Sequence, residues 1–294
     1  MDHTVVIPPD AQLDPLLRAY DAAVAAKRRQ FVLGLAILAA AFALACIGAE
    51  VDPGLFWEKL GNFTSYFNRL AHLDTGAVVL TDPAEWFWGL RRWTRMLADT
   101  LLMAYVGTLT GAVFAFCGGF LCSRNLVSSA MLRIVVRRFF EICRTVPDIV
   151  FALIFVAAFG LGALPGVLAI AIHTTGALGK LFSEVVENID MKPVEGIAAS
   201  GGGWVSQVRF GAVPQVLSNF ASYAVLRFEI NVRGAAVLGF VGAGGIGEEL
   251  IVAIRKFFYS DVSAMLLMIV VCVMVIDTLS EKLRHRLLAM DQPA

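Results

Sequence analysis

Long apolar runs separated by charged segments dominate this chain. A bilayer core of about 30 Å requires roughly 20 apolar residues in one helix. The first run of that length, 31–49, carries no charge and follows directly on Lys27, Arg28 and Arg29. A second charge-free run covers 100–123. Both predict membrane-spanning helices.

The uncharged run 149–179 is too long for one span and too short for two. Glycine and proline at Gly160, Gly162, Pro165 and Gly166 predict a tight turn within it, with a helix extending outward on each side. Two further apolar stretches complete the pattern. The predicted spans are 31–49, 100–123, 141–159, 166–183, 214–240 and 258–279.

The first span has an alternative interpretation as a signal peptide, because Ala-Leu-Ala-Cys at 43–46 resembles a lipoprotein cleavage box. However, thirty mostly polar residues precede the apolar run. The run also exceeds the about 7 to 15 residues of a signal-peptide core. An uncleaved anchor is therefore the favoured hypothesis.

Basic residues indicate the orientation of the six spans. Fifteen Lys and Arg lie on the side that holds both termini and seven on the other, which predicts cytoplasmic termini. The predicted parts are an N-terminal tail 1–30, a first span with its end at 31–51, an extracytoplasmic loop 52–95, a transmembrane domain 96–283 and a C-terminal tail 284–294. The aromatic-rich loop 52–95 forms either amphipathic helices in the outer interface or a partly folded hairpin.

Composition agrees with a membrane protein and narrows the function. The chain is 58% apolar and 16% charged, whereas soluble domains are roughly 45 to 50% apolar and 25% charged. Its 24 basic and 24 acidic residues balance, so it lacks the basic excess of a general nucleic-acid binder. The five cysteines are odd in number and lack paired ligand spacing, which argues against a disulfide scaffold and a zinc site.

The predicted cytoplasmic loop 190–214 carries the most informative motif. Gly201 follows Glu195 by six residues, and Pro214 follows Gly201 by thirteen. This spacing resembles the EAA loop of ABC-importer permeases, with departures at Gly196-Ile197, Gly211 and Val213. Small side chains would let a short helix seat closely in a groove of a partner protein. The coupling candidates are Glu195, Gly196, Ile197, Ala198, Ala199, Gly201 and Pro214; the alternative is an ordinary connector.

The resemblance extends over about 96–283, through Arg144-Thr-Val-Pro-Asp148, 152–184, Val213-Pro-Gln-Val216, 227–233 and 237–247, to the phosphonate ABC-transporter permease. It implies an all-α, type I (MetI-like) permease fold with six spans in the bacterial inner membrane. It also implies a homodimer, a cytoplasmic ATPase dimer that binds ATP and Mg, and a periplasmic phosphonate-binding protein. This chain would then be a non-hydrolytic subunit without a cofactor or metal of its own, in contact with membrane lipid.

Charged residues inside a span cost about 2.5 to 3.5 kcal/mol each on insertion scales and face the protein interior or an aqueous path. Arg227, Glu229 and Arg233 lie within the predicted span 214–240, and the last two form an i, i+4 pair. Arginine suits a path for phosphorus oxyanions because its planar fork binds such oxygens bidentately. The other hypothesis is a structural network with Asp148 or Asp277.

Three further groups are candidates for a gate or path. His173 and Thr174 are polar residues at membrane depth, where they line a path or are satisfied locally. Arg144, Pro147 and Asp148 form either a kinked helix entry or an inner gate element. The glycine-rich segment 242–247, which contains the candidates Gly242, Gly244 and Gly245, matches the dinucleotide pattern G-x-G-x-x-G through Gly242, Gly244 and Gly247, but no βαβ unit surrounds it. The segment instead predicts a turn near an extracytoplasmic gate or docking surface.

The leading hypothesis is the permease of an ATP-driven importer for phosphonate or a related phosphorus oxyanion. The same machine for another solute is one alternative, since no residue pattern identifies the ligand. A secondary carrier with Glu229 or Asp148 as proton relay is the other. A carrier needs no docking loop, and such carriers often show internal repeats, which this sequence lacks.

Overall fold

The computed structural model describes residues 10–73 and 75–289, and it divides into two units at Tyr66 and Phe67. In the first unit, helix α1 (Asp10–Gly48) runs through both the predicted span and most of the predicted polar tail. The tail is helical because residues 19–29 are mainly alanine, arginine and lysine, which favour helix, with no glycine or proline among them. The prediction of an apolar helix in the region 31–49 is confirmed, and the helix begins well before the predicted span, at Asp10; the boundary of a cytoplasmic tail at residue 30 stays a prediction.

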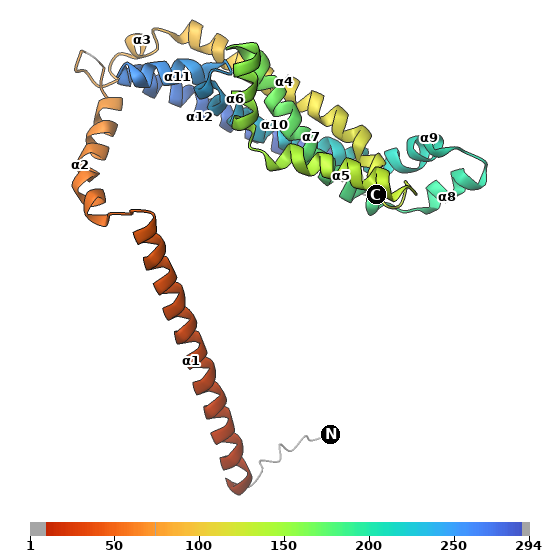
Figure 1. Cartoon of the computed structure of the whole chain (residues 1–294). Coiled ribbons are helices and arrows are strands. Elements are labelled where there is room, and N and C mark those ends of the chain that lie inside the picture. Colours follow the sequence, from red (N-terminus) through yellow and green to blue (C-terminus); the bar gives the residue numbers. More distant parts are fainter. Residues whose placement is uncertain (1–9, 74, 290–294) are drawn as a thin grey trace, which may run out of the picture. The chain divides into compact units, whose positions relative to one another are not determined.

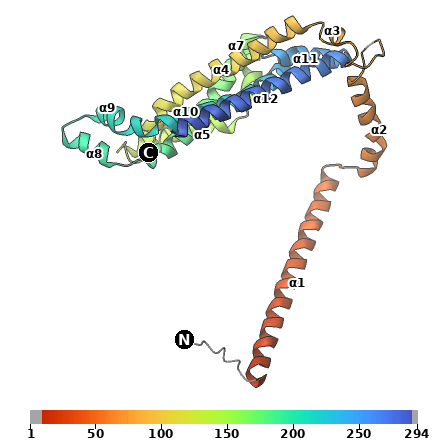
Figure 2. The same cartoon turned by 180° about the vertical axis from the view of Figure 1, so that it is seen from behind.

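The second unit is a helical bundle (Figures 1 and 2). It contains the end of α2 (Pro53–Leu70), followed by α3 (Pro83–Trp86), α4 (Leu90–Leu121), α5 (Ala130–Thr145), α6 (Asp148–Phe159), α7 (Ala163–Glu187), α8 (Lys192–Ala199), α9 (Trp204–Ser206), the π-helix η1 (Gln207–Ala212), α10 (Val213–Leu238), the 3₁₀-helix η2 (Gly239–Val241), α11 (Ile246–Arg255) and α12 (Tyr259–Ala289). Among the described residues the only strand-like pairing is one bridge between His72 and Val78. The predicted all-α class is confirmed.

Glycines let α7 lie at the centre of this bundle. A Cβ on Gly111 of α4 would come within 2.8 Å of the carbonyl oxygen of Ala171 in α7. A Cβ on Gly176 of α7 would lie 2.6 Å from the backbone nitrogen of Arg144 in α5. These backbones therefore approach more closely than any larger residue would allow, as in other membrane helix pairs. The position of α7 between α4 and α5 follows from these contacts.

Within 10–73 and 75–289, four helices are long and apolar enough to cross a membrane: Leu17–Gly48, Leu90–Leu121, Ala163–Glu187 and Tyr259–Leu287. Two bent pairs bring the number to six if each pair counts as one span, which agrees with the predicted count. The predicted continuous helix 141–159 is wrong, because α5 and α6 meet at an angle of 85°. The break lies at Val146, whose extended backbone (ψ 125°) is what a following proline favours.

The other predicted boundaries also shift. The turn after α6 covers Gly160 to Gly162 only. Pro165 is buried and lies in the first turn of α7, where proline is tolerated. The helical segment that leads into α10 begins at Trp204 rather than at Pro214. The span predicted at 258–279 continues to Ala289, across the expected start of the C-terminal tail. Helix α11 was not predicted.

Part of the aromatic-rich loop is anchored on the bundle. Trp93 at the start of α4 is 1% exposed and packs with α11 and α12. Trp86 donates from Nε1 to Ser263 Oγ at 3.0 Å, and Trp88 donates to Asp261 at 2.9 Å. Helices α2 and α3 occur within the loop, so it is partly helical; their position at a membrane interface stays a prediction.

Candidate coupling surface and charged layer

Helix α8 forms a surface of small side chains at one end of the bundle (Figure 1). Val194 is 3% exposed and packs into the core beside α7 and α10. On the opposite side, four of the predicted coupling residues are exposed: Glu195, Gly196, Ala198 and Ala199. We call these four residues the α8 surface. Ile197 is half-buried, so it belongs to the support of the helix.

Contacts of α8 and of the segments on either side of it tie the loop 190–214 to α10 and to the α4–α5 loop. Gln215 of α10 donates to the carbonyl of Asp190 and accepts from its backbone N–H, each at 3.0 Å. Gly211 packs against Val194, since a Cβ there would lie 3.0 Å from it. Trp204 donates from Nε1 to the carbonyl of Leu126 at 2.9 Å. A displacement of α8 would therefore be passed to α10.

The remaining two coupling candidates have other roles. Gly201 has φ +85°, the left-handed conformation that ends a helix and favours glycine. Pro214 occupies the first turn of α10, where its missing N–H costs nothing. The spacing of Glu195, Gly201 and Pro214 thus corresponds to an exposed helix, its terminating turn and the first turn of the returning helix.

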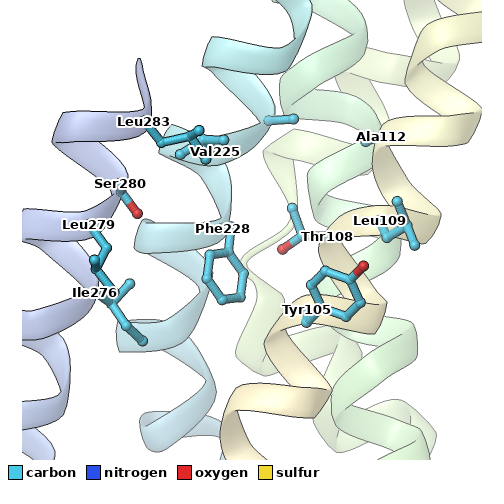
Figure 3. Close-up of a pocket in the computed structure, with 11 residues that line it drawn as sticks. Tyr105, Thr108, Leu109, Ala112, Val225, Phe228, Ile276, Leu279, Ser280 and Leu283 are labelled. Atoms are coloured by element: carbon cyan, nitrogen blue, oxygen red, sulfur yellow. The ribbon is translucent and has the colours of Figure 1, made fainter. Parts of the chain in front are cut away.

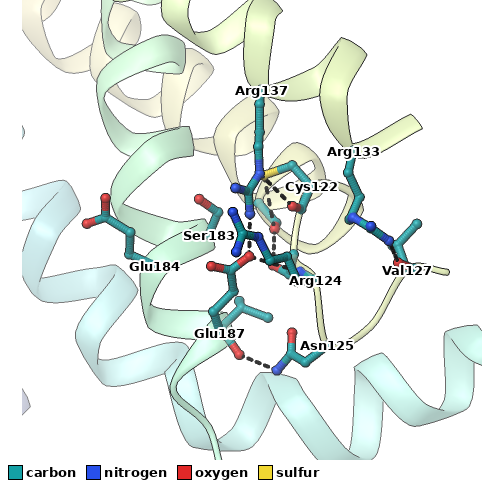
Figure 4. Close-up of polar contacts among 12 residues, drawn as sticks. Cys122, Arg124, Asn125, Val127, Arg133, Arg137, Ser183, Glu184 and Glu187 are labelled. Carbon is teal, nitrogen blue, oxygen red and sulfur yellow. Dashed lines mark hydrogen bonds and ion pairs between the residues drawn. The ribbon is translucent and has the colours of Figure 1, made fainter. Parts of the chain in front are cut away.

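A half-buried ion pair joins α5 to the end of α7, beside the α4–α5 loop (Figure 4). Glu187 accepts from the Arg137 guanidinium and, at 2.9 Å, from the backbone N–H of Arg124. Arg137 also donates from Nε to the carbonyl of Cys122 at 3.1 Å. Asn125 donates to the carbonyl of Val186 at 2.7 Å. The sequence analysis used these arginines only to predict the orientation in the membrane. Their partner Glu187 lies 63 residues after Arg124, so no local pattern indicates the contact.

Ionisable side chains from four helices lie along the second half of α10, between the levels of Arg227 and Gly234. We call them the charged layer: Asp148 of α6, His173 of α7, Arg227, Glu229 and Arg233 of α10, and Asp277 of α12. Arg233 pairs with Glu229 at 2.8 Å, which confirms the predicted i, i+4 pair, and with Asp277 at 3.8 Å. Arg227 contacts His173 Nδ1. A Cβ on Gly234 would lie 3.4 Å from Asp148 Oδ2, so Asp148 reaches α10 at the same level.

The structure changes two expectations about these charges. The trio on α10 alone carries one net positive charge, but Asp148 and Asp277 bring the layer to two arginines against three carboxylates with His173 neutral. In addition, Arg144 and Asp148 lie on separate helices and form no ion pair within the described residues. Pro147 is the residue that caps α6 and separates them.

A buried hydrogen-bond triad underlies the charged layer. Asn231 donates to Thr108 Oγ1 of α4 and to Thr174 Oγ1 of α7, both at 2.8 Å. Asn231 is 4% exposed and Thr174 is fully buried. Thr174 is therefore a structural contact of α10 with α7 rather than a lining residue. Sequence reasoning did not select Asn231.

Replacing Asn231 by leucine is expected to destabilise the folded subunit by about 1 to 3 kcal/mol. The substitution leaves the buried Thr174 hydroxyl without its donor, and such orphaned polar groups cost about that much. Thermal unfolding in detergent measures the loss. Ser222→Ala on the same helix is the control, since that buried serine forms no side-chain hydrogen bond with another described residue. An Asn231→Leu curve identical to that of Ser222→Ala would contradict the role of the triad.

The glycine-rich turn joins four helices. Gly242, Gly244 and Gly245 have φ between +78° and +83°. The carbonyl of Gly242 accepts from Gly162 at 3.0 Å, and Thr100 Oγ1 of α4 accepts from Ile246 at 2.9 Å. No strand flanks the turn among the described residues. It therefore packs the start of α7 and α11 against α4, which is a structural role consistent with the expected turn.

An apolar groove of about 370 Å³ lies between α4, α10 and α12 (Figure 3). Its walls include Tyr105 and Phe228, whose rings meet edge to face at 6.3 Å, and Leu279. Thr108 and Ser280 are its main polar groups. The groove contains none of the charged-layer residues.

A bundle of four to six candidate spans with a small-residue helix at one end is the architecture of a multi-pass transport permease. The model of the family described as "Binding-protein-dependent transport system inner membrane component" matches residues 107–287, and this chain belongs to that family. It is therefore a membrane subunit of a transport system.

Relatives and solved structures agree with this assignment. The chain is 40% identical over 221 residues to the phosphite transport system permease protein PtxC of Stutzerimonas stutzeri, covering 75% of this chain and 80% of that protein. It is 38% identical over 209 residues to the phosphate-import permease protein PhnE of Mycolicibacterium smegmatis, covering 71% and 38%. A putative cryptic phosphonate transport system permease protein of Escherichia coli, PhnE2, is 50% identical over 117 residues, covering 40% and 96%.

The fold is also that of an importer permease. A chain of the methionine ABC transporter MetNI in an inward-facing conformation superposes with a TM-score of 0.57 at 20% identity, over 66% of this chain and 95% of that one. A second crystal form gives a TM-score of 0.59 at 19% identity, over 70% and 98%. The predicted MetI-like permease fold is confirmed.

Proposed function

We propose that this chain is the permease subunit of an ATP-driven importer that moves a phosphorus oxyanion into the bacterial cytoplasm by alternating access. The observation that carries the proposal is the α8 surface, an exposed set of small side chains on a helix fastened to α7 and α10. The substrate class rests on relatives named for phosphite, phosphate and phosphonate transport. All three are oxyanions of phosphorus.

The partners follow from the same mechanism. Two copies of this chain would form the membrane part, a cytoplasmic ATPase dimer would bind ATP and Mg and seat on the two α8 surfaces, and a periplasmic binding protein would deliver the substrate. The excess of Lys and Arg on one side, fifteen against seven, supports cytoplasmic termini and a cytoplasmic α8. This subunit would itself hydrolyse nothing.

The rigid connection explains how closure of the ATPases would reach the substrate path. Helix α10 begins next to α8 and carries Arg227 fourteen residues after Val213, which is about 20 Å along a helix. Rigid-body displacement is a common way for packed helices to transmit such motion. Charged side chains at that depth must face protein or water rather than lipid, which suits a path at the charged layer.

The complete complex tests the proposal. The chain is reconstituted in liposomes with its ATPase, and the binding protein is added after loading with methylphosphonate, phosphite or phosphate in turn. We expect severalfold stimulation of ATP hydrolysis and ATP-dependent uptake for at least one of the three. Failure to retain an ATPase, together with uptake that persists without ATP, would instead identify a secondary carrier.

A further inference from the structure

The two arginines of the charged layer have different surroundings. Arg233 is held by two carboxylates, Glu229 on its own helix and Asp277 on α12. Arg227 forms no ion pair within the described residues, and its one hydrogen-bond partner there is the uncharged ring nitrogen of His173. We propose that Arg227 is the oxyanion contact of the translocation path, that His173 is its positioning residue, and that Arg233 is structural. This inference rests on the proposed function.

Arg233 is already neutralised by its neighbours. Its Nη2 lies 2.8 Å from Glu229 Oε1 and its Nη1 lies 3.8 Å from Asp277 Oδ2. The pair spans α10 and α12, so the arginine acts as a clasp between these helices. An anion that bound Arg233 would have to compete with both carboxylates. Arg233 is therefore the poorer ligand for a passing substrate.

Most of the hydrogen-bond donors of Arg227 have no partner among the described residues. The guanidinium carries five N–H groups, and only Nη2 is engaged, with His173. The Nε atom is buried and has no hydrogen-bond partner. The nearest compensating charge is the carboxylate of Asp148, which interacts with Arg227 electrostatically without forming an ion pair. A half-buried guanidinium in this condition gains by contacting an anion.

His173 holds the guanidinium in place. Because Arg227 is always a donor, the Nδ1 atom that it contacts must be the unprotonated acceptor. The ring also interacts with the backbone of Arg144 at the end of α5. The next residue, Thr174, is fixed to α10 through Asn231 at 2.8 Å. The imidazole therefore lies on a firmly packed part of α7, and it orients Arg227 without neutralising it.

This arrangement suits passage rather than retention. A planar guanidinium can engage two oxygens of a phosphonate, phosphite or phosphate at once. The Asp148 carboxylate, which accepts from its own neighbour Ile149 at 2.9 Å, stays within electrostatic reach of the same arginine. Its repulsion weakens the hold on the substrate anion. The substrate anion can then both bind to Arg227 and leave it.

Uptake assays on the complete complex in liposomes separate the two arginines, with the loaded binding protein supplying phosphite or phosphate. For Arg227→Gln we expect at least a tenfold loss of uptake while the ATPase is still stimulated, and partial recovery in Arg227→Lys. The double variant Arg233→Gln/Asp277→Asn removes one charge of each sign from the clasp and is expected to keep more than half of wild-type uptake if it folds. Unchanged uptake in Arg227→Gln would overturn the proposal, as would equal losses in Arg227→Lys and Arg227→Gln.

His173 variants test the positioning role. Glutamine offers an oxygen acceptor to Arg227, whereas leucine removes the acceptor at similar size. We expect His173→Gln to keep most of the uptake and His173→Leu to raise the substrate concentration for half-maximal uptake severalfold, with the same thermal stability in detergent. Equal kinetics in the two variants would show that the imidazole only fills space.

The outcomes distinguish this inference from the proposed function. If wild-type complex takes up none of methylphosphonate, phosphite and phosphate, the substrate class fails. If wild-type uptake is normal and Arg227→Gln matches it, only the assignment of Arg227 fails. Loss of both uptake and ATPase stimulation in Arg227→Gln, with normal thermal stability, would make Arg227 a coupling residue and would also overturn its role as the oxyanion contact.

Discussion

Replacing Gly196 by tryptophan is expected to lower ATP-dependent uptake at least tenfold while the permease stays folded in the membrane. A Cβ at this exposed position meets nothing within 4 Å, so the bulk does not disturb this chain. Leaving glycine also favours the helix by up to about 1 kcal/mol. The indole would instead occupy the space in which a partner protein must seat against the α8 surface.

Basal and stimulated ATP hydrolysis, measured beside uptake, show whether coupling is the step lost. Gly203→Trp is the matched control, since Gly203 is also exposed and open but lies outside α8. Gly196→Ala should behave as wild type. Gly201 is less suitable for this test, because its φ of +85° means that any side chain there would strain the backbone. Equal uptake in Gly196→Trp and wild type would contradict the coupling role of α8.

The largest effect on folding is expected for Gly247→Ala in α11. A Cβ at Gly247 would lie 1.8 Å from the carbonyl oxygen of Ala236 and 3.1 Å from the Cα of Gly239. Both atoms belong to the backbone, so relief requires α11 to move away from α10. Overpacking typically costs about 1 to 3 kcal/mol and occasionally more, and a clash with two backbone atoms belongs at the upper end of that range. We expect little monodisperse subunit after detergent extraction.

Size-exclusion chromatography and thermal unfolding of a fluorescently tagged chain measure this loss. Gly196→Ala adds the same methyl group where nothing lies within 4 Å, and it should migrate and melt as wild type. If Gly247→Ala were as stable as that control, the close contact of α10 with α11 would be wrong. The result matters for function because this contact fixes the glycine-rich turn against Thr100.

The apolar runs and the coupling motif could be predicted from the sequence because both are local. A span requires only enough consecutive apolar residues, and the α8 surface consists of neighbours in the chain, Glu195 to Ala199. The helix break at Pro147 follows from proline chemistry, but the 85° angle between α5 and α6 does not. That angle depends on what α6 packs against.

Helix α11 and the π-helix η1 were missed for a related reason. The segment 246–255 is only ten residues long and follows the glycine-rich turn, although Ile246, Leu250 and Ala253 recur at the i, i+4, i+7 spacing of an amphipathic helix. Its helix is held by Ile246, Leu250 and Ala253, which pack with Trp93 and α12 from distant parts of the chain. No local pattern reports such contacts.

The sequence alone therefore determined the membrane class, the apolar helices and the small-residue loop 190–214, since length, hydropathy and spacing are properties of consecutive residues. Only the tertiary structure decided how the buried charges are shared. Close approach of backbones at Gly111 and Gly176 sets the depth of α7 and brings His173 to Arg227. The packing of α12 brings Asp277 to Arg233. One arginine is consequently neutralised and the other is left with a neutral partner, because ion pairing depends on distances between helices that sequence order does not specify.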